Sequence, residues 1–167
     1  MTGTGLQLVD LMPVEAAMRV EQLAGSGSLL EVVGSQRQAR IWMLELLVDL
    51  LGHDRRFCAL EERGNEALAF IDRRGPRWNV AALTGPPGSP TSLYDTLAWF
   101  GNEVVLADDP TTLVLDGLRT AADVGCSLWV GVEHRATLPA AALVLEVGDD
   151  ESCTRVWTPD DGALFGV

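Results

Sequence analysis

The sequence predicts an α+β domain, with N-terminal helices packed on a mainly antiparallel sheet and two further helices toward the C-terminus. Helical periodicity marks the segments Val14–Ala24 and 36–51. Short extended segments separated by turn residues follow them, which is typical of an antiparallel meander. Several of these segments are apolar on both faces, so we expect a sheet that is covered on both sides. The length of 167 residues suits a single domain over residues 1–167.

In the N-terminal part of the chain, the sequence does not decide how the helix 36–51 is buried or which structure the run Leu29–Val33 adopts. The helix 36–51 begins after Ser35, which together with Gln38 has the form of a capping box. Apolar residues surround nearly the whole of this helix, so it lies either in the core or in the subunit interface of a homodimer. The short apolar run Leu29–Val33, which follows the helix Val14–Ala24, is either a strand or a helical turn.

The rest of the chain contains strands and two helices. Turns rich in Gly, Asn and Pro separate three extended segments, which we expect to form an antiparallel meander. The strands of this meander are Phe57–Glu62, 67–72 and 78–84. After the proline-rich stretch 85–90 we expect a short helix, a strand, a longer helix and three more strands. In that order, they occupy residues 91–100, 103–107, 110–125, 127–133, 141–147 and Cys153–Thr158.

Composition and charge exclude several classes of function. Acidic residues outnumber basic residues 24 to 12, and the net charge of −12 argues against nucleic-acid binding. Every basic residue is arginine, which excludes lysine nucleophiles and a phosphate-binding loop that depends on lysine. The three cysteines are scattered, as expected for reduced thiols in the cytoplasm. We find no targeting signal and no apolar run long enough to span a membrane, so we expect a soluble cytoplasmic protein.

The meander predicts a cluster of arginines at one edge of the sheet. In an antiparallel meander, the start of the first strand, the end of the second and the start of the third lie together. These positions carry Arg55, Arg56, Arg73, Arg74 and Arg77, with His53 just upstream. Guanidinium groups bind phosphate or carboxylate through forked hydrogen bonds, so the cluster is a candidate anion site. The alternative is that these arginines neutralise neighbouring acidic loops.

The other polar and aromatic groups support no catalytic, cofactor or metal site. Neither histidine lies in a recognised catalytic motif, and the acidic pairs lack the spacing of a calcium loop. Two groups are candidates for contact with a partner protein. The first is the aromatic pair Trp99 and Phe100. The second is the acidic turn of Asp149, Asp150 and Glu151 between the last two strands.

These observations lead to two alternative functions. The first is an acidic cytoplasmic binding module, without catalysis, that inhibits, chaperones or regulates a basic protein partner, as immunity proteins and antitoxins do. Strong negative charge favours fast association with positive surfaces. The second is a domain that binds a small anionic ligand, or a small enzyme, with a tryptophan-lined pocket and the arginine cluster.

Overall fold

The computed structural model describes most of the strands and the N-terminal helices. The described residues are 7–24, 29–51, 55–62, 80–85, 104–109, 126–134, 141, 143–159 and 162–166, with the backbone alone at 24, 61, 62 and 80–85. Within these residues, no helix is long and apolar enough to cross a membrane.

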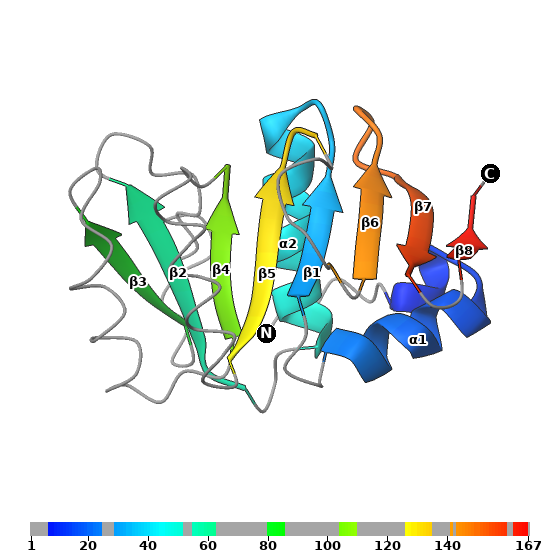
Figure 1. Ribbon diagram of the computed structural model, residues 1–167, viewed down its shortest axis with the longest axis horizontal. Coiled ribbons are helices and arrows are strands. Elements are labelled where there is room, and N and C mark those ends of the chain that lie inside the picture. Colours follow the sequence, from blue (N-terminus) through cyan, green and yellow to red (C-terminus); the bar gives the residue numbers. More distant parts are fainter. Residues whose placement is uncertain are drawn as a thin grey trace.

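The described strands form one eight-stranded sheet in the order β3-β2-β4-β5-β1-β6-β7-β8 (Figure 1). In chain order, the strands are β1 (Leu29–Val33), β2 (Phe57–Glu62), β3 (Val80–Gly85), β4 (Val104–Asp108), β5 (Ser127–Val132), β6 (Leu143–Val147), β7 (Cys153–Thr158) and β8 (Gly162–Phe165). The run 29–33, which the sequence left undecided, is therefore a strand near the middle of the sheet.

The prediction of a mainly antiparallel sheet is wrong. All pairings from β3 through β2, β4, β5 and β1 to β6 are parallel. Only the described pairs β6–β7 and β7–β8 are antiparallel. Strands that are buried on both faces read as continuous apolar runs, and this is the pattern of parallel sheets. The segments between the parallel strands are also long enough for crossover connections.

The expected meander is absent from the sheet. β2 pairs directly with β3 in parallel, with Phe57 opposite Val80. The strand expected at 67–72 and the helices expected at 91–100 and 110–125 lie outside the described residues. A further strand that the sequence did not predict, β8, forms the edge beyond β7.

The helices pack at different places on this sheet. A short 3-10 helix, η1 (Leu8–Asp10), precedes α1 (Val14–Ala24), and α2 (Arg37–Leu51) follows β1. Figure 1 shows α2 lying across one face, behind β5 and β1, while α1 lies below the end of the sheet that contains β6 to β8. Most side chains between Ala39 and Val48 of α2 are buried within the single chain, so this helix belongs to the core.

Both faces of the sheet are buried. Leu30, Leu106 and Trp129 point to the face covered by α2 and pack in one cluster with Met43 and Leu44 of that helix. A second cluster, on the opposite face, contains residues at the alternate positions of the same strands. Its members are Cys58, Leu60, Val105, Ala107, Cys126, Leu128, Val130 and Val132. This alternation brings the side chain of Asp108 to the α2 face, beside Gly131, at the carboxyl ends of β4 and β5.

Candidate functional site

The candidate site lies at the carboxyl ends of the central parallel strands. After β1, the chain passes through α2 to β2, which lies on the β5 side of β1 in the sheet. After β5, the chain continues to β6, which lies on the opposite side of β1. Such a point, where strand order reverses, is where open α/β sheets bind their ligands. The N-terminus of α2 reaches this edge and brings Arg37 and Arg40 close to Asp108 at the end of β4.

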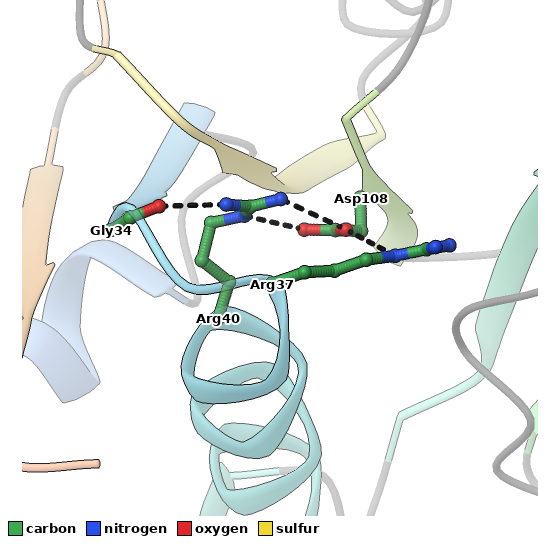
Figure 2. A network of polar contacts seen from close by, with 4 residues as sticks. All are labelled: Gly34, Arg37, Arg40 and Asp108. Atoms are coloured by element: carbon green, nitrogen blue, oxygen red, sulfur yellow. Dashed lines mark hydrogen bonds and ion pairs between the residues drawn. The ribbon is translucent and has the colours of Figure 1, made fainter. Parts of the chain in front are cut away.

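Arg40 is the central side chain of the site (Figure 2). Its Nε donates to Asp108 Oδ1 at 2.9 Å, and its Nη2 donates to Asp108 Oδ2 at 3.3 Å. Its Nη1 donates to the backbone carbonyl of Gly34 at 2.7 Å. Arg40 is only 3% exposed, so this is a buried, forked ion pair that joins the turn after β1 to the end of β4.

Arg37 approaches the same carboxylate from the solvent side. Its Nε lies 3.5 Å from Asp108 Oδ2, and 44% of its side chain is exposed, whereas the side chain of Asp108 is fully buried. Figure 2 shows the two guanidinium groups lying on either side of Asp108. The described cluster of two arginines and one aspartate therefore carries one net positive charge, in a chain that is strongly negative overall.

Two glycines make room for this cluster. A Cβ at Gly131 would collide with Asp108 Oδ1, so the carboxylate lies against the backbone of β5. A Cβ at Gly34 would lie 2.6 Å from Val147 Cγ2 and 3.1 Å from the Val147 carbonyl oxygen. Larger residues at either position would have to displace β6 or the ion pair itself.

The acidic turn between β6 and β7 adjoins the site. Ser35, in the turn before α2, donates its hydroxyl to Asp149 Oδ1 at 2.8 Å. A hydrogen bond from the Ser152 hydroxyl lowers the pKa of Asp150 below its ordinary value. Asp149 and Asp150 are exposed and Glu151 is partly exposed. Their contact with a partner protein stays a prediction.

The predicted arginine cluster was derived from strand directions that the structure does not have. Arg55 and Arg56 lie directly before β2, at the amino end of the strand, whereas the site described here lies at the carboxyl end. The cluster depended on an antiparallel meander, and β2 and β3 are parallel. His53, Arg73, Arg74, Arg77, Trp99 and Phe100 lie outside the described residues, and their roles remain predictions.

Comparison with known proteins finds similar structures but no matching sequence family. No family model and no curated protein match the chain. The structure is similar to the VirB11 ATPase of the Brucella suis type IV secretion system, with a TM-score of 0.55 at 14% identity over 84% of this chain and 51% of that one. It is also similar to the Legionella pneumophila ATPase DotB, with a TM-score of 0.56 at 9% identity over 93% of this chain and 52% of that one. The flagellar accessory protein FlaH from Methanocaldococcus jannaschii matches with a TM-score of 0.49 at 11% identity, over 77% of this chain and 76% of that one.

The chain has the fold of VirB11 and of DotB. It spans about half the length of VirB11 and of DotB. This finding corrects the prediction of an acidic module that inhibits, chaperones or regulates a basic protein, and with it the analogy to immunity proteins. The parallel strands β1 to β6, with a helix leading directly from β1, are the part of the structure that overturns the predicted antiparallel fold.

The β1–α2 turn joins a strand to a helix, as a phosphate-binding loop does, but its residues differ from the pattern of such a loop. Such a loop joins a strand to a helix and has the pattern G-x-x-x-x-G-K-[ST]. Gly34 follows β1, and Arg40, which stands six positions later, replaces the lysine. Ala39 replaces the second glycine and Ile41 replaces the hydroxyl residue. Sequence reasoning missed this position because it required a lysine; the signal was the spacing from Gly34 to Arg40 between an apolar strand and a helix.

The residues at this turn fit a phosphate group better than they fit a magnesium ion. Guanidinium groups donate forked hydrogen bonds to phosphate, and the side chain of Arg37, the first residue of α2, is exposed to solvent. Magnesium in such sites is held by the Ser or Thr of the loop and by an aspartate at the end of a neighbouring strand. Ile41 supplies no oxygen, and both oxygens of Asp108 already face arginines.

Proposed function

We propose that this chain is a nucleotide-binding domain of the ATPase type, which holds the phosphate groups of a nucleotide at the β1–α2 turn. The observation that carries the proposal is the position of Arg37 and Arg40 at the carboxyl end of β1, in a chain with the fold of VirB11 and DotB. The VirB11 ATPase was solved in complex with sulphate, an oxyanion of the same shape as phosphate.

Each element of the turn has a separate role in this proposal. Arg37, with its exposed guanidinium group, contacts the phosphate directly. The backbone N–H groups in the first turn of α2 have no partner within the helix, and together with the helix dipole they favour an anion. Arg40 acts as a positioning residue, because its bonds to Gly34 and Asp108 fix the turn against β4.

The test is a calorimetric titration of the purified chain with ATP and with ADP. The variant Arg37→Ala removes the accessible donor while keeping the buried Arg40–Asp108 pair, so we expect it to fold and to bind about 10-fold more weakly. Arg19→Ala is the matched control. It removes the same charge from α1, where Arg19 donates to Gln22, and should leave the affinity unchanged.

Two results would contradict the proposal. One is the absence of binding at millimolar nucleotide by a chain whose circular dichroism shows a folded protein. The other is equal weakening by Arg37→Ala and Arg19→Ala, since that would reflect net charge instead of a site. As part of the same proposal we place the protein in the cytoplasm, where nucleotides are abundant and where buried thiols such as Cys58 remain reduced.

A further inference from the structure

The position that supplies a metal-binding hydroxyl in a phosphate-binding loop is apolar in this chain. Ile41 directly follows Arg40 on α2 and is only 3% exposed. It packs in the core cluster of the α2 face together with Leu44 and Val48. An aliphatic side chain offers no lone pair, whereas magnesium requires oxygen ligands in octahedral geometry. The turn therefore lacks the ligand that normally comes from its own helix.

The carboxylate at the end of β4 is committed to cations of the protein. Asp108 accepts from Arg40 Nε at 2.9 Å and from Arg40 Nη2 at 3.3 Å, and Arg37 Nε lies 3.5 Å away. Arginine stays protonated at any pH that the fold survives. A magnesium ion on this carboxylate would lie beside two permanent positive charges. Nor do the described residues contain a cluster of three carboxylates, histidines or cysteines that could hold a metal elsewhere.

The exposed Arg37 can supply positive charge to a phosphate group where a metal would otherwise do so. Asp108 offsets one of the two guanidinium charges, so the cluster keeps one net positive charge. The exposed guanidinium group of Arg37 presents planar N–H donors that match two phosphate oxygens at once, whereas Nε, Nη1 and Nη2 of Arg40 already donate to Asp108 and Gly34. Only residues 34–36 separate β1 from α2, so the turn offers few backbone donors and side-chain donors must do more of the binding.

We infer that this chain binds the phosphates of its nucleotide without magnesium, with Arg37, which lies beside the buried Arg40–Asp108 pair, taking over the neutralising role of the metal. This inference rests on the proposed nucleotide-binding function. It assigns to the site around Arg37 a preference for the free, uncomplexed triphosphate. A nucleotide that carries magnesium brings positive charge to a cluster that is already positive, so the complexed form binds no better than the free form.

The experiment compares titrations of the intact chain with ATP in EDTA and in excess magnesium chloride, at matched ionic strength. We expect the affinity in EDTA to equal or exceed the affinity in magnesium. Arg37→Ala should lose about 10-fold in EDTA, and Arg19→Ala should lose nothing. The loss of ATP affinity caused by Arg37→Ala should be smaller in magnesium than in EDTA, because the metal then replaces part of the missing charge.

The possible outcomes separate this inference from the function on which it rests. Binding that is 10-fold or more tighter with magnesium would leave the nucleotide site standing and overturn the metal-free inference. An Arg37→Ala variant that binds normally in EDTA would also overturn it. The absence of binding in both solutions would overturn the proposed function, and this inference with it.

Discussion

Arg40 and Asp108 show how a buried charge pair can organise a site and constrain stability. Asp108 is fully buried, and its two oxygens accept from the Arg40 fork. Bringing both charges out of water is costly, and their mutual attraction offsets that cost only while both are present. The glycine at 131 is required because the carboxylate occupies the space of a side chain.

The first prediction concerns the removal of one partner from this pair. Asp108→Asn leaves Arg40 buried at 3% exposure without a counter-charge, so we expect the free energy of unfolding to fall by about 3–5 kcal/mol. Urea denaturation followed by circular dichroism measures this loss. The double variant Arg40→Met with Asp108→Asn removes both charges and should cost clearly less than the sum of the single variants. Additive costs would show that the two side chains do not interact.

The buried thiols predict how stability depends on pH. Burial raises the pKa of Cys58 from 9.0 to about 12 and that of Cys153 from 9.0 to about 11. Above about pH 9 the unfolded chain therefore loses protons that the folded chain keeps, and unfolding becomes more favourable as pH rises. We expect each thiol to lower the free energy of unfolding by about 1.4 kcal/mol per pH unit above pH 9, until its folded pKa is reached.

Urea denaturation at several pH values between about 8 and about 10 tests this dependence. The matched control is the double variant Cys58→Ala with Cys153→Ala. It is expected to be somewhat less stable at neutral pH, because small cavities form, yet to show a shallower decline at alkaline pH. If the decline were as steep in the variant as in the natural chain, other groups would be responsible for it.

At the scale of the element, helices and strands could be predicted well, but their pairing could not. The bounds Val14–Ala24, Phe57–Glu62 and Cys153–Thr158 agree with the structure residue for residue. The hairpin of β6 and β7 was also predictable, because an acidic, glycine-containing turn joins two nearby strands. Local propensity and periodicity act within a few residues, so they determine such elements and short connections.

The direction of the central strands depends on contacts between distant segments. β1 lies between β5 and β6, which begin 98 and 114 positions after β1 begins. Nothing near Leu29–Val33 specifies these neighbours. The apolar runs on both faces of β4 and β5 did carry the relevant signal, since buried parallel strands have this pattern. The same pattern predicts a sheet that is covered on both sides, and it also favours parallel strands.

At the scale of the whole molecule, the expected arginine cluster was derived from an antiparallel meander, which the structure contradicts; the cluster itself stays a prediction. The Arg55 and Arg73 regions were expected to meet because the strands were expected to be antiparallel. Parallel pairing instead brings together the carboxyl ends of β1, β4 and β5, where Arg37, Arg40 and Asp108 lie. Asp108 is separated from Arg40 by 68 positions, and only the strand order places them in contact. Charge and residue type alone could not select these arginines among twelve basic residues.

The last prediction follows from the net charge of −12. A compact chain of this charge repels itself, and salt weakens the repulsion as the screening length falls from about 30 Å at 0.01 M to about 8 Å at 0.15 M. The buried Arg40–Asp108 pair is hardly screened, because solvent ions do not reach it. We therefore expect the midpoint of thermal unfolding to rise over this range of sodium chloride. The double variant Glu15→Gln with Glu21→Gln, which removes two exposed negative charges from α1, should show a smaller rise. A midpoint that falls with salt would mean that attractive surface ion pairs outweigh the repulsion.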